Sequence, residues 1–150
     1  MIHTYPGKDQ WSIGEEEFME RIAESSKSVV DHFAPSICFV NVMRNMSVSC
    51  DCEGLAAQPV VTPNVGILAS LDICAIDSAS VDMIFAMNER DKSDMVERME
   101  SRHGLRQLSY MHELGMCNRR YGLSDLDNNE VRVTATDAVK DVKPFKVRPI

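Results

Sequence analysis

Apolar side chains recur at three- and four-residue steps in several stretches, which is the pattern of helices that bury one face. The first stretch spans about residues 15–33, begins with three glutamates and ends before Pro35. Acidic residues suit the positive end of a helix, and proline disfavours helical backbone in the residue before it. A second helix is predicted over about 73–88, with Asp72 or Ser70 able to cap its first turn.

Two further helices are predicted in the second half of the chain. Apolar positions over about 105–114 predict an amphipathic helix, with Gly115 as its C-terminal cap. A short surface helix is predicted over 95–101, after a charged turn at 88–94.

Short apolar runs predict the strands. Residues 37–43 and 65–69 are almost continuously apolar, as in strands that are covered on both faces in a parallel sheet. Residues 131–135 alternate, which is typical of a half-exposed edge strand. Between the first two runs, 44–64 form a polar loop of about 20 residues, and loops of that length are usually functional or disordered. The predicted fold is α/β: a small mixed or parallel sheet flanked by three to four helices, with a long cysteine-containing loop.

Length and composition limit the organisation and the partners. The 150 residues fit a single α/β domain over 12–136, with a lead-in segment at 1–11 and a tail at 137–150. The net charge of −7 argues against binding to a phosphate backbone. No apolar run approaches the roughly 20 residues that cross a bilayer, so neither nucleic acid nor membrane is an expected partner.

Five cysteines, an odd number, and no recognisable secretion signal favour reduced thiols and a cytoplasmic location. They are Cys38, Cys50, Cys52, Cys74 and Cys117.

The candidate chemistry is concentrated in the long loop. Cys50, Asp51 and Cys52 place two thiols and a carboxylate within three residues, and Gly54 permits a tight turn around them. Thiolates with carboxylates suit iron or zinc, so this segment is a candidate metal site. Two unliganded cysteines in a turn are the simpler alternative. A dithiol–disulfide cycle ranks below metal binding, because the flanking carboxylates raise the pKa of a thiol.

Asp77 is a second candidate ligand. It lies on a helix otherwise lined by apolar residues, and a partly buried carboxylate there requires a hydrogen-bond donor, an arginine or a metal. Cys74 is three residues away on the same helix face. A structural hydrogen bond is the other interpretation of Asp77. No activated nucleophile is visible, so the sequence leaves open whether the chain is an enzyme.

Three motifs in fixed order resemble a family of uncharacterised iron–sulfur centre proteins, a domain of unknown function. They are the Cys-Asp-Cys-Glu-Gly segment at 50–54, Gln-Pro-Val-Val-Thr-Pro-Asn-Val-Gly-Ile-Leu-Ala-Ser at 58–70, and the helix start at 72–79. The resemblance extends over about 11–123. It implies that Cys50, Asp51, Cys52 and Asp77 are metal ligands, and it implies no reaction.

The chain departs from that family in two respects. Family members usually carry an upstream half and a ferredoxin module with two four-iron clusters, whereas this sequence has no Cys-x-x-Cys-x-x-Cys run and resembles the part downstream of the module. Cys74 also stands where the family tends to have proline.

Two hypotheses follow from the sequence. The first is a metal-binding or redox-associated domain related to iron–sulfur centre proteins. The alternative is a non-catalytic interaction domain, which forms a homo-oligomer or partners an upstream ferredoxin-containing half.

Overall fold

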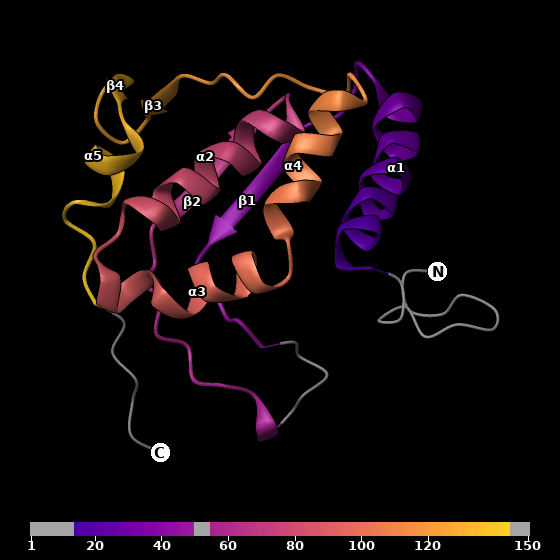
Figure 1. The fold of residues 1–150 in the computed structure, drawn as a ribbon. Coiled ribbons are helices and arrows are strands. Elements are labelled where there is room, and N and C mark those ends of the chain that lie inside the picture. The colour runs from indigo at the N-terminus through magenta and orange to yellow at the C-terminus, as the bar shows by residue number, and fades with distance from the viewer. Residues whose placement is uncertain (1–13, 50–54, 145–150) are drawn as a thin grey trace.

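A computed structural model describes residues 14–49 and 55–144 of the chain, and these form a mixed α/β fold (Figure 1). The elements are α1 (Glu15–Phe33), β1 (Phe39–Met43), β2 (Gly66–Ser70), α2 (Ile73–Ala86), α3 (Glu89–Ser101), α4 (Gly104–Glu113), β3 (Leu123–Asp125), β4 (Val131–Val133) and α5 (Ala135–Val139). The predicted class, a small sheet flanked by helices, is confirmed.

Helix α2 is the central element, with one buried cluster near each of its ends. Near its N-terminus, Cys74 packs with Ala23 of α1 and Met111 of α4, and all three side chains are fully buried. Near its C-terminus a second cluster joins α2 to the sheet and to α5. That cluster consists of Met43, Met83, Ile84, Met87 and Val139.

Strands β1 and β2 pair antiparallel, in a register that runs from Phe39 opposite Ser70 to Met43 opposite Gly66. The long loop therefore leaves and re-enters at the Met43–Gly66 end of this sheet. The opposite end leads directly into α2. Five-residue strands rise about 13 Å from end to end, so the loop anchors and the start of α2 are well separated.

The two faces of this sheet differ in their surroundings. One face packs on α2, where the Asn41 side chain donates a hydrogen bond to Asp77 at 2.8 Å. The other face exposes Val40, Val42 and Ile67 to 56%, 58% and 67%. The expectation that these apolar runs are covered on both faces is wrong for the described part of the chain, because α2 covers only one.

Helices α3 and α5 extend the fold beyond the sequence prediction. Helix α3 begins at Glu89, inside the expected charged turn, because the Asn88 side chain caps it by accepting the N–H of Asp91 at 3.2 Å. Helix α5 starts from a capping box between Thr134 and Asp137. Its Val139 is 5% exposed, so the predicted tail contains at least one core residue.

Helices α1 and α4 are joined at the surface by Arg106. Its guanidinium donates to Glu20 of α1 at 2.7 Å and to Glu113 at 2.6 Å, and it lies 5.0 Å from the centre of the Tyr110 ring. The Tyr110 hydroxyl in turn donates to Glu24 of α1 at 3.0 Å. These contacts hold α1 over the cluster that contains Cys74.

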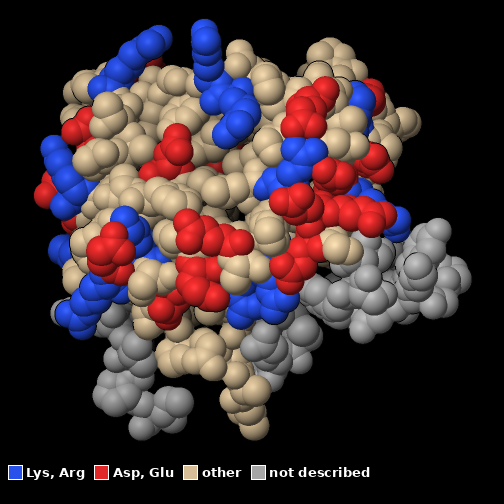
Figure 2. Space-filling view, viewed as in Figure 1, with Lys and Arg blue, Asp and Glu red and all other residues tan. Residues whose placement is uncertain are grey.

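No described helix has both the length and the apolar character needed to cross a membrane. Figure 2 shows lysine and arginine interspersed with aspartate and glutamate on the face in view. The described residues of this face thus form no continuous basic surface of the kind that follows a phosphate backbone.

Candidate functional site

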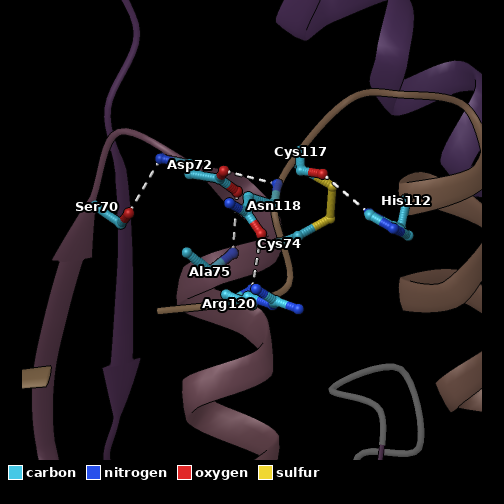
Figure 3. Close-up of a disulfide and its surroundings, with 8 residues drawn as sticks. All are labelled: Ser70, Asp72, Cys74, Ala75, His112, Cys117, Asn118 and Arg120. Atoms are coloured by element: carbon cyan, nitrogen blue, oxygen red, sulfur yellow. Dashed lines mark hydrogen bonds between the residues drawn. A yellow bond between two sulfur atoms is a disulfide. The ribbon is translucent and has the colours of Figure 1, made fainter. Parts of the chain in front are cut away.

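A disulfide joins Cys74, in the first turn of α2, to Cys117, in the segment that follows α4 (Figure 3). The two residues are 43 positions apart in sequence, and their Cα atoms lie 5.5 Å apart. Cys74 is fully buried and Cys117 is partly exposed. Reduced thiols were expected for this chain, so the pairing is a difference from the sequence prediction.

Asp72 determines where α2 begins and hence where Cys74 lies. One carboxylate oxygen of Asp72 accepts the N–H of Ala75 at 3.0 Å, which confirms Asp72 as the N-cap. The N–H of Asp72 donates to the Ser70 hydroxyl at 3.0 Å. These bonds fix the turn between β2 and α2, so that Cys74 is the second residue of the helix.

Gly115 turns the chain so that Cys117 meets α2. Its φ of 67° lies in the left-handed region that glycine adopts without steric cost. The N–H of Gly115 donates to the carbonyl of His112 at 3.0 Å, and the N–H of Met116 donates to that of Met111 at 3.2 Å. This pair of bonds is the Schellman motif, and it confirms Gly115 as the C-terminal cap of α4.

The segment after α4 is fastened to α2 at two further points. The second carboxylate oxygen of Asp72 accepts the N–H of Asn118 at 2.8 Å. Farther along α2, Asp82 accepts the hydroxyl of Tyr121 at 2.6 Å. Together with the disulfide, these bonds hold residues 117–121 along α2.

Replacing Asp72 by alanine is expected to lower the free energy of unfolding by about 1–2 kcal/mol, the usual effect of losing an N-cap. Asp72→Asn keeps one oxygen for the N–H of Ala75 but presents an NH₂ group to the N–H of Asn118. Its free energy of unfolding should therefore fall by less than that of Asp72→Ala. Urea unfolding of the three proteins tests this order. Asn88→Ala is the matched control, because it removes the cap of α3 without touching the disulfide. Equal stability of wild type and Asp72→Ala would contradict the bridging role of Asp72.

Burial and the hydrogen bond to Asp82 raise the pKa of Tyr121 to about 12. Since an unfolded tyrosine titrates near pH 10, folding favours the neutral phenol. This contribution to stability is complete below pH about 10 and is lost as the pH rises toward about 12. The free energy of unfolding of wild type should therefore fall relative to that of Tyr121→Phe above pH about 10. If the free energies of unfolding of wild type and Tyr121→Phe change in parallel with pH, the raised pKa of Tyr121 is contradicted.

The Asp72 carboxylate and the sulfurs of Cys74 and Cys117 form a compact donor set. One potential ligand atom from each residue lies within 4.8 Å of the other two. The sequence predicts the N-cap at Asp72 and the cap at Gly115 but not this trio, because the two cysteines are distant in sequence. Asp72 as a helix cap and Gly115 as a turn were the only local signals for it.

The sequence-predicted ligands are distributed differently. Cys50, Asp51 and Cys52 lie outside the described residues. Asp77 lies on α2 and accepts the hydrogen bond from Asn41, so β1 supplies a polar partner for its carboxylate. Among the described residues Asp77 is not part of the donor set around the disulfide.

A family model described as a domain of unknown function, DUF362, matches residues 1–82, more than half of the 150-residue chain. The chain belongs to this family. No curated protein and no solved structure matches it. The DUF362 match covers α1, β1, β2 and most of α2, and so includes Asp72, Cys74 and Asp77. Cys117 lies beyond it, so the disulfide connects the DUF362 region to the remainder of the chain.

Proposed function

We propose that this DUF362 chain is a thiol-based metal-binding domain in which Asp72, Cys74 and Cys117 hold a soft divalent cation such as Zn²⁺ when the cysteines are reduced. The observation that carries the proposal is the approach of one carboxylate oxygen and two sulfurs to within 4.8 Å of one another. Ligands about 2.0–2.3 Å from a tetrahedral ion lie roughly 3.5–3.8 Å apart. Once the disulfide is reduced, the two sulfurs have to separate to this spacing, and together with the Asp72 oxygen they then offer three ligands on one side of an ion.

The donor chemistry favours zinc or iron over magnesium or calcium, because thiolates prefer softer ions. Both Asp72 oxygens already accept backbone N–H groups. Each carboxylate oxygen has a second lone-pair direction, so Asp72 can bind an ion and keep these bonds. Ser78 lies one helical turn after Cys74, and its buried hydroxyl has no hydrogen-bond partner among the described residues. That hydroxyl is available to a thiolate or to a water that completes the coordination.

The cysteine-rich loop remains a second proposed ligand set. Cys50, Asp51 and Cys52, with Asp77, are the site implied by the resemblance to iron–sulfur centre proteins. A cytoplasmic location is proposed as well. It agrees with the metal-binding role, because disulfides in the cytosol are usually transient and a pair such as Cys74–Cys117 would be reduced there.

The test is an equilibrium titration of the reduced chain with Zn²⁺ under anaerobic conditions, in competition with a chromophoric chelator. The proposal predicts one Zn²⁺ per chain in a Cys50→Ser, Cys52→Ser variant, where only the Asp72 site has both of its thiols. Binding by wild type that disappears in this variant would assign the metal to the loop instead. No binding by either protein would refute a metal site in both places.

A second candidate function is supported by the exposed side of the β1–β2 sheet. Val40, Val42 and Ile67 present three apolar side chains on one face, and patches of this kind commonly mark contacts between proteins. We propose self-association through this face as the alternative function, with a ferredoxin-containing half as the other candidate partner.

Sedimentation velocity tests that alternative. Wild type should form a concentration-dependent dimer, and Val42→Asp should be monomeric, because a carboxylate in an apolar interface is costly to desolvate. Val131→Asp is the matched control, since Val131 is also an exposed strand valine, on β4. A wild-type chain that sediments as a monomer at all concentrations would refute self-association.

A further inference from the structure

The two sulfurs of the disulfide differ in their access to solvent. Cys74 is fully buried in α2, packed against Ala23 of α1 and Met111 of α4. Cys117 is partly exposed and lies in the segment between α4 and β3, outside any helix or strand (Figure 3). Cys117 packs against the same buried cluster but is the more exposed of the two residues, so a reagent in solution approaches the disulfide from the Cys117 side.

The two ends of the bond also differ as leaving groups. In thiol–disulfide exchange, a thiolate attacks one sulfur and the other sulfur departs with the bonding electron pair. Cys74 is the second residue of α2, near the positive end of the helix dipole, which favours a thiolate. The nearby charge of Asp72 opposes this effect, but both of its oxygens accept backbone N–H groups. Attack at Cys117 with departure of Cys74 is thus favoured by the greater exposure of Cys117.

We propose that Cys117 is the exchange site of this domain for low-molecular-weight thiols and their disulfides, and that this exchange gates the metal site. A small thiolate attacks Cys117 Sγ and the Cys74–Cys117 bond breaks. Cys74 leaves as a thiolate, and a mixed disulfide forms on Cys117. A second small thiolate attacks the outer sulfur of that mixed disulfide and releases Cys117 as a thiolate. The protein disulfide has then gained two electrons, and two small thiols have become one small disulfide.

The gating part rests on the proposed function, because the same two sulfurs serve as metal ligands. A sulfur held in the disulfide has no thiolate charge to offer a metal ion. The oxidised chain therefore does not bind a metal ion at this site, whereas the reduced chain, with two free thiols, does. The reverse exchange, with a small disulfide as oxidant, expels the ion and restores the Cys74–Cys117 bond.

The exchange site is tested on the full wild-type chain after oxidation with glutathione disulfide. A brief exposure to reduced glutathione is stopped with acid, free thiols are alkylated, and peptides are mapped by mass spectrometry. The modification of Cys74 and that of Cys117 are then measured separately from those of the other cysteines. The expected result is a glutathionyl group on Cys117 in at least about tenfold excess over Cys74, with Cys74 alkylated. The proposal is overturned if Cys74 carries as much glutathione as Cys117, or more. It is also overturned if the disulfide does not form, or if glutathione opens it at neither cysteine.

The gate is tested in the Cys50→Ser, Cys52→Ser variant, which removes the loop thiols. The oxidised form should bind Zn²⁺ at least about 100-fold more weakly than the reduced form, and added glutathione should restore binding. Cys38→Ser in the same background is the matched control, because Cys38 is a free and exposed cysteine that should not affect the gate. Equal binding by the oxidised and reduced forms would overturn the gate.

Failure of the exchange site and failure of the proposed function give different results. Labelling of Cys117 without Zn²⁺ binding by the reduced chain would leave the exchange site and remove the metal site and its gate. Zn²⁺ binding by the reduced chain with labelling of Cys74 would remove the exchange site alone.

Discussion

Cys74→Ser and Cys117→Ser are each expected to weaken Zn²⁺ binding by the reduced chain at least about 100-fold, measured in the Cys50→Ser, Cys52→Ser background. Changes behind a metal ligand already cost about 10–100-fold in affinity, and these variants remove a ligand itself. A serine hydroxyl is neutral near pH 7 and is a weak ligand for Zn²⁺, whereas a bound cysteine is a thiolate. Chelator competition at one pH for all variants measures the ratio.

Two controls make this result specific. Cys38→Ser removes an exposed free cysteine outside the donor set and should bind Zn²⁺ as its parent does. Asp72→Asn keeps the side-chain shape but replaces an anionic ligand with a neutral amide. Its loss of Zn²⁺ affinity should lie between that of Cys38→Ser and that of Cys74→Ser. If Cys74→Ser and Cys117→Ser bind Zn²⁺ as tightly as their parent, the two sulfurs are not ligands.

Met111→Ala is expected to cost about 2–5 kcal/mol in the free energy of unfolding, the usual range for truncating a buried methionine. Met111 is fully buried and packs against Ala23 and Cys74, where α1, α2 and α4 meet. Shortening its side chain leaves a cavity beside the disulfide that the surrounding helices can fill only in part. Urea unfolding of the oxidised proteins measures the loss.

Two further variants separate packing from helix propensity. Leu105→Ala on the same helix removes a side chain that is 40% exposed, and its loss should be clearly smaller than that of Met111→Ala. Met111→Leu roughly conserves volume and should cost less than about 1.5 kcal/mol. Similar losses for Met111→Ala and Leu105→Ala would contradict a central packing role for Met111.

The helices were largely predictable because their signals are local. The apolar spacing over 15–33 predicts the observed bounds of α1, Glu15–Phe33. Asp72 and Gly115 predict a helix start and a helix end through their own backbone chemistry. The apolar pattern does not predict the start of α3, because the charged first turn of this helix carries no apolar stripe and depends on the Asn88 cap.

The strands show where local patterns stop being informative. An apolar run indicates that a strand buries its side chains but does not identify what covers them. Val40 and Val42 belong to such a run, yet both are more than half exposed in the chain on its own. Strand direction likewise depends on the course of the long loop, which sequence periodicity does not encode.

The disulfide could not be predicted from sequence for a similar reason. Cys74 and Cys117 meet only because the cap at Asp72 and the turn at Gly115 direct two distant segments toward each other. Five cysteines allow many pairings, and no local signal selects this one. The candidate at Cys50 and Cys52 was visible instead because its donors are adjacent in sequence.

X-ray absorption at the zinc edge, on the reduced and Zn²⁺-loaded Cys50→Ser, Cys52→Ser variant, tests the metal site most directly. We expect two sulfur ligands at about 2.3 Å and the remaining ligands, oxygen or nitrogen, at about 2.0–2.2 Å. Replacing both Cys74 and Cys117 by serine should abolish the sulfur shell. A first shell of oxygen and nitrogen alone in the parent protein would contradict a metal site built on Cys74 and Cys117.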